Sequence, residues 1–501
     1  MGGTKHMRSK PSRTKPKAAK KELSFDVGQS LTNKLCEYAQ LQDSCPCCFA
    51  TEDHEWTGCL VPATHPIHHD AKSSYSDDSL RASSHSSRTL VETQSNSNPV
   101  LHPAPPLDSS PELPVLEPPT QPREQRGATT FEDMETLEVV QQLAARYGRV
   151  SHMGILDRNY GFFVNQARTA ALTYKVQNQV AIVSGDPLCE PCMFNEILVE
   201  FNKFRKAFRL GLAFMGTSNT FVKYASQWHW TAMEFGIERV INPMENEVLM
   251  ERAGKRIISQ NKQLLCPGKG GITLEVYVPA YKQDLVLEKE IKNIYDAWRQ
   301  RRNETATAPQ AFITVFDLFD FPNLMTYIYT RGPDGVMNGF AALRRMGADQ
   351  GYHIDPCIAA LDAPKGISDL MMYAAMALLN QAGVSYLSLG YEPLSALGNV
   401  TGVKPSLERI PRSIYSHSVR QLPVGGKKAY HDKFKPDPNQ DSGLYMVFPS
   451  RLPGPRQMVA MAHMANISIR NLIYTNTKLQ YARGPVRSSR DSRGHENGGS
   501  I

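Results

Sequence analysis

Several side chains that could do chemistry lie at predicted strand ends between Asp355 and Ser395, in the run DPCIAALDAPKGISDLMMYAAMALLNQAGVSYLSLGYEPLS. This run is typical of a strand, a turn containing Pro and Gly, an apolar helix, a second strand and a polar loop. Site residues on α/β scaffolds are carried where strands end, because the bodies of the elements are buried. Asp355 could orient an amino group or assist removal of a proton, although a strand-capping carboxylate would occupy the same position.

Other polar residues are candidates for the same site, and each also has an ordinary structural interpretation. Lys433 could stabilise an oxyanion or bind a terminal ribose-phosphate, or it could be a solvated surface lysine. Asp369 follows Gly366 by three residues, where it could bind substrate or cap the helix. Glu392 is a candidate for binding an α-ammonium group, and Asp186 is expected to fix a turn. The predicted substrate-binding set is Asp369, Tyr391, Glu392, Ser395 and Asp186.

Basic side chains form two local zones inside the predicted folded part of the chain. The formal net charge of the 501 residues is +7, but residues 1–22 alone hold eight Lys or Arg against one Glu. Net charge is therefore weak evidence for a nucleic-acid partner. Residues 252–302 hold eleven basic against five acidic residues, and residues 403–435 hold eight against two. Such zones could follow a phosphate backbone or be solvated faces. The candidate phosphate-binding residues are Lys289, Lys292, Arg299, Arg301, Arg302, Arg344, Arg345 and Lys428.

The order of predicted elements repeats along the chain. Helical spacing of apolar residues predicts helices over 134–147 and 194–208, and strands are predicted in FFVNQ, ALTYKV, QVAIVSG and LGLAFMG. Later come a strand at FITVF, a hairpin with a Gly-Pro-Asp-Gly turn, a strand at CIAALD, a helix over 367–381 and a strand at VSYLSLG. Pairing Gly-Asp-Pro at 185–187 with Asp-Ala-Pro at 362–364 gives a repeat of roughly 175 residues. Two copies of one α/β domain are therefore predicted.

The predicted organisation has five parts. They are a disordered basic and Pro/Ser-rich tail at 1–128, a first domain at 129–286, a basic connecting helix at 287–303, a second domain at 304–480 and a disordered tail at 481–501. The Cys- and His-rich stretch between residues 36 and 69 could hold zinc or be a reactive or lipid-modified cysteine cluster. Met458, Met461 and Met464 could be core or a soft surface for lipid. Without a signal peptide or long apolar run, the chain is expected to be cytoplasmic and peripheral to membranes.

A hairpin followed by strand, helix and strand is the element order of the GNAT, or acetyltransferase-like, fold. Members that use acetyl-CoA carry an R/Q-x-x-G-x-G/A loop, whose backbone N–H groups bind the pyrophosphate. The runs QLLCPGKGG at 263–271 and RRMGA at 344–348 do not fit this pattern. Coenzyme A is therefore a weak candidate, and another activated acyl donor is indicated.

The chain resembles the DUF2156 family, the C-terminal catalytic domain of bacterial phosphatidylglycerol lysyltransferases, over about residues 131–475. The resemblance rests on GDP at 185–187, Asp355, DAPKG at 362–366, Asp369, LGYEPLS at 389–395 and KAYHDKF at 428–434. It implies two tandem GNAT-like domains joined by a basic helix, and transfer of an amino acid from aminoacyl-tRNA to a lipid hydroxyl. The chain departs from the family where Ile358 replaces an Arg and where Tyr391-Glu392 replaces Met-Ala. A changed amino acid, a changed lipid or both are expected.

Freestanding relatives of this kind resemble the fungal ergosteryl-amino-acid synthases, which implies glycine transfer to the 3β-hydroxyl of ergosterol. Aminoacyl transfer to phosphatidylglycerol, a CoA-dependent GNAT acyltransferase and a non-catalytic relative that binds tRNA or lipid remain alternatives. The basic residues named above would then bind tRNA. Further expected partners are the membrane lipid, the membrane surface in transient contact, and an aminoacyl-tRNA synthetase.

The chemistry of such a transfer can be stated from first principles. An aminoacyl ester is already activated, so transesterification needs positioning, removal of a proton and stabilisation of an oxyanion, and it needs no metal. Asp355 and Lys433 are the predicted catalytic residues. No cofactor is expected beyond aminoacyl-tRNA as co-substrate.

Overall fold

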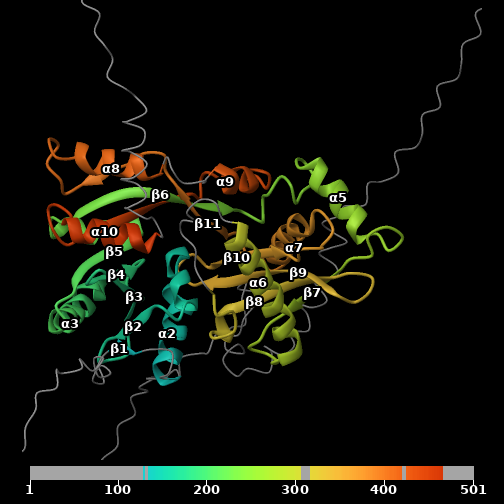
Figure 1. Cartoon of the computed structure of the whole chain (residues 1–501), viewed down its shortest axis with the longest axis horizontal. Helices are drawn as coiled ribbons and strands as arrows, with labels where there is room; N and C mark the ends of the chain where they lie inside the picture. The colour runs from blue at the N-terminus through green and yellow to red at the C-terminus, as the bar shows by residue number, and fades with distance from the viewer. Residues whose placement is uncertain (1–127, 130–133, 306–315, 420–424, 466–501) are drawn as a thin grey trace, which may run out of the picture. The chain divides into compact units, whose positions relative to one another are not determined.

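The fold is described from a computed structural model of the chain (Figure 1). The structure describes residues 128–129, 134–305, 316–419 and 425–465, all within one compact unit. The predicted tails, apart from Ala128, lie outside the described residues, as do the Cys- and His-rich stretch and the FITVF strand before Phe316. In the described part of the chain, no helix is both long and apolar enough to cross a bilayer.

A first group of elements, which we call the first half, covers residues 128–241. Its elements are β1 Ala128–Thr129, α2 Met134–Tyr147, η1 Val150–Leu156, β2 Gly161–Val164, β3 Ala171–Gln177, β4 Val180–Ser184, η2 Pro191–Met193, α3 Phe194–Ala207, β5 Gly211–Thr217, α4 Asn219–Gln227 and β6 Thr231–Ile241.

Helix α5, Lys255–Leu265, precedes a second group of elements, which we call the second half and which covers residues 273–464. Its elements are β7 Thr273–Tyr277, α6 Leu285–Thr305, η3 Pro322–Leu324, β8 Met325–Arg331, β9 Met337–Met346, β10 Gly351–Ala359, α7 Ile367–Gln381, β11 Leu387–Pro393, β12 Val400–Thr401, α8 Arg409–Val419, α9 Gly425–Asp432, β13 Ser442–Phe448 and α10 Pro455–Met464.

The strands of the two halves form one sheet whose order is equivalent from either edge. It runs β1-β2-β3-β4-β5-β13-β6-β11-β10-β9-β8-β7, and β12 pairs with β6. Strands β4 and β5 pair in parallel, and so do their counterparts β10 and β11. The other pairs on this path are antiparallel. The fold is therefore mixed α/β with two GNAT-like halves, as the sequence predicts.

The two halves exchange their last strands. Strand β13 lies between β5 and β6, so that Met446 pairs with Met215 and Ser442 with Glu238. Strand β6 in turn pairs with β11, its neighbour in Figure 1, and places Glu238 opposite Tyr391. Strand β7, inside the predicted first domain, pairs with β8 of the predicted second. The sheet is continuous across the predicted domain limits, and those limits stay a prediction.

Helix α6 is slightly longer than the predicted basic connecting helix and has the place in the second half that α2 has in the first. Each follows an edge strand and precedes the next strand of its half. Leu287, Ile291 and Tyr295 are buried along one stripe of α6. A helix with one apolar stripe packs on the core and leaves its other side to solvent. Helix α6 is thus an integral part of the second half as well as a connection.

Helix α7 is buried on all sides, because its sequence is apolar over nearly its whole length. Residues from Leu370 to Leu379 are almost inaccessible and pack between α5 and the sheet. Its observed bounds are those predicted from the sequence, as are those of α2. In α10, Met461 is buried, with Met458 and Met464 partly buried against the same cluster. The core interpretation of the Met-rich segment is therefore confirmed.

Strand β10 differs from its prediction in a way that matters for the site. It begins at Gly351, before the predicted CIAALD segment, so Asp355 lies inside the strand and not at its end. The register of β10 against β9 shifts between Ile354 and Cys357, and the Asp355–Pro356 peptide is cis. A bulge of this kind turns side chains away from the regular alternation of a strand.

Candidate functional site

The candidate site lies where β10 and β11 stop pairing. Only Tyr352 with Leu387 and His353 with Ser388 are paired in parallel register. Beyond them β10 is bulged at Asp355, and the register of β11 against β6 shifts between Ser388 and Tyr391. Gly390 has a φ of 87° in this stretch, a value that favours glycine. Strands β10 and β11 therefore separate beside Asp355 and Tyr391, which are among the site residues predicted from the sequence.

Several buried polar atoms in this region lack a hydrogen-bond partner among the described residues. They are Nε and Nη1 of Arg344, Nε2 of His353 and Oε1 of Glu238. Arg344 is only 1% exposed, and its Nη2 donates to the carbonyl oxygens of Arg149 (3.1 Å) and Val150 (3.2 Å). A buried polar group without a partner costs about 1–3 kcal/mol, so such atoms are normally satisfied. These four atoms are therefore candidates for contact with a ligand or with water.

The charges of three cations act on the Asp355 carboxyl group. Burial raises the pKa of Asp355, and the positive charges of Lys427, Arg302 and Arg344 oppose that rise. Burial lowers the pKa of Arg344 to about 10, so its guanidinium remains protonated at neutral pH. The Asp355 carboxyl group is thus accompanied by an excess of positive charge, which suits stabilisation of a developing anion.

His353 is a neutral base candidate beside these charges. Burial lowers its pKa well below the usual value, and the neighbouring cations Arg344 and Lys427 lower it further. The imidazole is neutral at pH 7 and can accept a proton or a hydrogen bond. A Cβ atom built on Gly390 would lie 3.1 Å from His353 Nε2 and 3.2 Å from Lys427 Nζ. Gly390 thus lets the backbone pass close to both nitrogens.

The structure brings two predicted residues, Lys433 and Asp369, together as an ion pair. Lys433 Nζ lies 2.8 Å and 3.0 Å from the two carboxylate oxygens of Asp369, and 4.2 Å from the ring centre of Tyr430. Asp369 does not act as the cap of α7, whose N-cap is Gly366. The lysine whose charge acts on Asp355 is Lys427, six residues earlier in the chain.

Glu392 and Lys428 form a second ion network. Glu392 lies 2.5 Å from Lys428 Nζ and 3.2 Å from Arg239 Nη1. Arg239 also contacts Asp432 and Asp441, each at 3.3 Å. Both predicted residues are thus engaged with partners of this chain. Of the other two predicted residues, Ser395 is exposed, and Tyr391 of β11 is partly buried with a pKa that burial raises to about 12.

The predicted tRNA-binding residues divide by location. Lys289, Lys292, Arg301 and Arg302 are exposed on α6, whereas Arg299 is partly buried beside Asp296 at 3.9 Å. Arg345 is partly buried in β9. Arg344 is buried inside the sheet, so it cannot lie on a surface that follows an RNA backbone. The interpretation of Arg344 as a surface phosphate contact is corrected accordingly, because adjacent residues of a strand face opposite sides.

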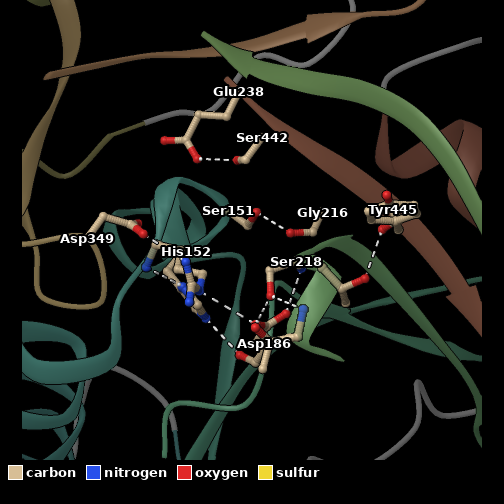
Figure 2. Close-up of polar contacts among 12 residues, drawn as sticks. Ser151, His152, Asp186, Gly216, Ser218, Glu238, Asp349, Ser442 and Tyr445 are labelled. Carbon is tan, nitrogen blue, oxygen red and sulfur yellow. Dashed lines mark hydrogen bonds and ion pairs between the residues drawn. The ribbon is translucent and has the colours of Figure 1, made fainter. Parts of the chain in front are cut away.

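A corresponding region in the first half is closed by η1 (Figure 2). Parallel pairing of β4 and β5 ends at Ser184 with Met215, and Asp186 follows two residues later, as Asp355 follows His353. Asp186 accepts hydrogen bonds from Ser218 N (2.8 Å) and Ser218 Oγ (2.6 Å) and thereby holds the start of α4.

Helix η1 supplies the remaining contacts of this closed region. His152 Nε2 lies 2.8 Å from the carbonyl oxygen of Asp186. Ser151 Oγ donates to the carbonyl of Gly216, and Ser184 Oγ donates to the carbonyl of Ser151 at 2.8 Å. Ser151, His152 and Asp186 thus form their hydrogen bonds with other groups of this chain.

Sequence reasoning missed three residues of the candidate site, namely Lys427, His353 and Glu238. Lys427 is adjacent to Lys428, and only the helix places the two about 100° apart. His353 stands two residues before Asp355, a spacing that could have placed both on one side of a regular strand. Glu238 comes from the first half, and no local signal connects it to this site.

Two solved structures and one family model identify the fold and the family of this chain. The solved structure of L-PGS from Bacillus licheniformis has a TM-score of 0.51 and 19% identity, covering 70% of this chain and 97% of its own. A C-terminal DUF2156 domain from Agrobacterium fabrum has a TM-score of 0.51 and 20% identity, covering 66% of this chain and 95% of its own. Both have the same tandem α/β fold. The family described as phosphatidylglycerol lysyltransferase, C-terminal, matches residues 141–448, and the chain belongs to it.

Two curated relatives are similar to part of this chain. The lysylphosphatidylglycerol biosynthesis bifunctional protein LysX of Rhodococcus jostii is 24% identical over 273 residues, which is 54% of this chain and 23% of the relative. A phosphatidylglycerol lysyltransferase of Staphylococcus haemolyticus is 19% identical over 306 residues, which is 61% of this chain and 35% of the relative. The chain thus spans about a quarter to a third of their length.

Proposed function

We propose that this protein transfers an aminoacyl group from aminoacyl-tRNA to the hydroxyl group of a membrane lipid. The observation that carries the proposal is the cluster of buried, unpaired polar atoms where β10 and β11 separate. Family membership supports it, and the relatives are named for lysyl transfer to phosphatidylglycerol. A tandem fold alone would not specify this chemistry, because function depends on the site.

The proposed reaction exchanges one ester for another. The oxygen of the lipid hydroxyl attacks the carbonyl carbon of the aminoacyl ester, and the ribose oxygen of the tRNA leaves. Asp355 takes the proton of the lipid hydroxyl and returns it to the ribose oxygen, since a raised pKa makes its carboxylate a better base. One ester bond forms and one breaks, so no further reactant is needed.

Lys427 is assigned to the oxyanion in place of the predicted Lys433. The tetrahedral intermediate carries a negative charge on the former carbonyl oxygen, and a fixed cation beside it lowers the barrier. The charge of Lys427 acts on Asp355, whereas Lys433 is bound by Asp369. Lys433 then has a structural role, which is to hold α9 against the start of α7.

The exposed basic residues of α6 support tRNA as the donor. Lys289, Lys292, Arg301 and Arg302 lie on the same helix, and the charge of Arg302 acts on Asp355. A basic helix that ends beside the site could hold the acceptor arm of a tRNA with its ester directed at that carboxylate. Binding of this kind weakens as salt rises. An aminoacyl-tRNA synthetase would supply the charged tRNA.

The acceptor is proposed first as a class of chemical group and then as a particular lipid. A lipid hydroxyl is the shared chemistry, and phosphatidylglycerol is the acceptor that the relatives' names indicate. Glycine transfer to ergosterol rests on the sequence resemblance alone and is tested as a second acceptor. Tyr391 and Glu392, which depart from the family's Met-Ala, provide the reason to test both.

The experiment incubates the purified full chain with tRNA charged with labelled lysine or glycine and with vesicles containing either phosphatidylglycerol or ergosterol. Labelled lipid in the organic extract is the expected result, and pretreatment with RNase should abolish it. Labelling that resists RNase, or that needs an acyl-CoA instead, would favour the CoA-dependent alternative. Binding of tRNA without labelled lipid would favour the non-catalytic alternative.

Two neighbouring lysines provide the matched variants for this assay. We expect Lys427→Ala to lower the rate about 100-fold or more, as removal of an oxyanion-stabilising group does. Lys428→Ala should lower it only a few fold, because Lys428, although equally exposed, is bound by Glu392 and is not one of the cations whose charge acts on Asp355. Equal rates for the two variants would contradict the assignment of Lys427.

A further inference from the structure

Glu238 is a buried carboxylate that the first half contributes to the second half through the exchanged strands. It lies on β6, opposite Tyr391 of β11 and Ser442 of β13. Only 3% of its surface is exposed. Its Oε2 lies 3.4 Å from Ser442 Oγ, as Figure 2 shows, whereas Oε1 has no partner among the described residues. A carboxylate kept for structure alone would be expected to use both oxygens.

Arg344 connects Glu238 electrostatically to the candidate site. The charges of Glu238 and Asp355 both act on the guanidinium of Arg344. Two nitrogens of that guanidinium, Nε and Nη1, are also without a partner. The region therefore contains an unused acceptor on Glu238 and unused donors on Arg344, and both are buried.

An aminoacyl ester has the complementary pair of groups. Its α-ammonium group donates hydrogen bonds, and its carbonyl oxygen, attached to the adjacent carbon, accepts them. A buried carboxylate with a free oxygen is suited to the ammonium, and a guanidinium with free N–H groups is suited to the carbonyl. An ionised phosphate, which only accepts hydrogen bonds, would match Arg344 alone.

We propose that Glu238 binds the α-ammonium group of the aminoacyl ester while Arg344 donates to its carbonyl oxygen. This inference rests on the function proposed above and extends it to the group that the enzyme recognises on its donor. The first half then has a direct part in the site, because β6 is the strand that it places beside β11. Recognition of a free ammonium also excludes donors whose amino group is acylated.

The test compares tRNA charged with a free amino acid against the same tRNA after N-acetylation of that amino acid. The wild-type chain should strongly prefer the free amino group. In Glu238→Gln, the rate with the free form should fall on the order of 10- to 100-fold, as for loss of a charged hydrogen bond, while the N-acetyl rate stays unchanged. Glu245→Gln, which alters an exposed carboxylate beyond the end of β6, is the matched control and should retain the full preference.

A binding measurement separates this inference from the transfer reaction. A 3′-aminoacylamino-adenosine, whose amide cannot be transferred, is titrated with each protein in its free and N-acetylated forms. Tighter binding of the free form that disappears in Glu238→Gln supports the inference even if no lipid is labelled. Equal loss of both forms, or an unchanged preference in Glu238→Gln, would overturn it even if wild-type transfer is efficient.

Discussion

The two halves carry an Asp-Pro pair two residues beyond the point where their parallel strands stop pairing, yet the two aspartates have opposite surroundings. Asp186 is fully engaged by Ser218 and lies near Arg149 at 3.6 Å. Among the described residues, the side chain of Asp355 has no hydrogen bond or ion pair, and the positive charges of Lys427, Arg302 and Arg344 act on it. The same strand geometry thus serves stability in one half and a candidate reaction in the other.

The difference arises from η1, which fills the strand separation of the first half. Ser151 and His152 supply the hydrogen bonds that a ligand would otherwise make. In the second half the corresponding region contains the unpaired atoms of Arg344 and His353. Unsatisfied polar groups are costly, and they persist where function requires them. Closure by η1 in the first half therefore explains why, of the two strand separations, only that of the second half is a candidate active site.

The largest expected effect comes from separating the halves. Residues 128–272 expressed alone lose β13 from between β5 and β6, so both strands acquire an unpaired edge. We expect this fragment to be insoluble or to unfold without a cooperative transition. Co-expression with residues 273–465 should restore soluble protein. A fragment that melts cooperatively by itself would show that the exchange of strands is not required for folding.

The two aspartates provide the next test. Asp355→Asn should reduce lipid labelling about 1,000-fold or more while leaving the protein at least as stable as wild type, because a general base is removed without loss of a structural contact and burial already disfavours its charged form. Asp186→Asn should cost about 1–3 kcal/mol of stability and retain most of the labelling, because it weakens the bonds to Ser218. Labelling assays and urea denaturation on the same preparations measure both. Loss of activity in a fully stable Asp186 variant would contradict the comparison.

Glu238 should make the free energy of unfolding depend on pH. Burial raises the pKa of Glu238 from 4.5 to about 7, and the charge of Asp349 adds to the rise, whereas the neighbouring Ser388, Tyr386 and Arg149 oppose it. The folded protein therefore holds a proton that the unfolded chain loses above pH 4.5, so this group destabilises the fold progressively as pH rises towards 7.

Glu238→Gln removes that destabilisation. Relative to wild type, the variant should gain stability between pH 5 and 8, by up to roughly 3 kcal/mol, even though its transfer rate falls. Denaturation at several pH values measures the gain. A stability difference that does not change with pH would mean that Glu238 is already ionised at low pH. The groups that face Glu238 from neighbouring elements, Arg344, Tyr391, Arg149, Asp349 and Tyr386, must be intact in this comparison.

The smallest effect is expected on the surface of α6. Replacing Lys289 and Lys292 by Ala should weaken tRNA binding a few fold and reduce the salt dependence by about two phosphate contacts. The matched control removes Lys203 and Lys206, which are exposed on α3 of the first half. Filter binding over a range of salt concentrations measures both. Equal weakening in the two double variants would indicate a general effect of net charge.

Local features of this fold could be predicted from the sequence, and long-range ones could not. The bounds of α2 and α7 follow from helical spacing and from the Gly366 start signal. The exchange of β6 and β13 depends on pairing between residues about 200 positions apart, which leaves no local pattern. Alternation along a strand predicts that Arg344 and Arg345 face opposite sides of the sheet, but it does not indicate which of the two is buried.

The candidate site was predicted in part for the same reason. Asp355 and the following residues up to Ser395 are predicted as site residues because they form one contiguous stretch of the sequence. The motif KAYHDKF at 428–434 points to Lys433 and begins one residue after Lys427, so only the structure, with Lys433 bound by Asp369, draws attention to Lys427. Glu238 belongs to a strand whose role in the site is created by the fold, so sequence order places it far from the residues it serves.

The palindromic strand order has a consequence for the origin of the molecule. A single half on its own would leave the edge of its fifth strand unpaired. A second, identical copy could cover that edge by donating its own last strand and accepting one in return. Such a copy would be stable as a domain-swapped homodimer with two equal sites. Within one polypeptide the two strand separations need not be alike, so that η1 can close the first while the second keeps its unpaired polar atoms.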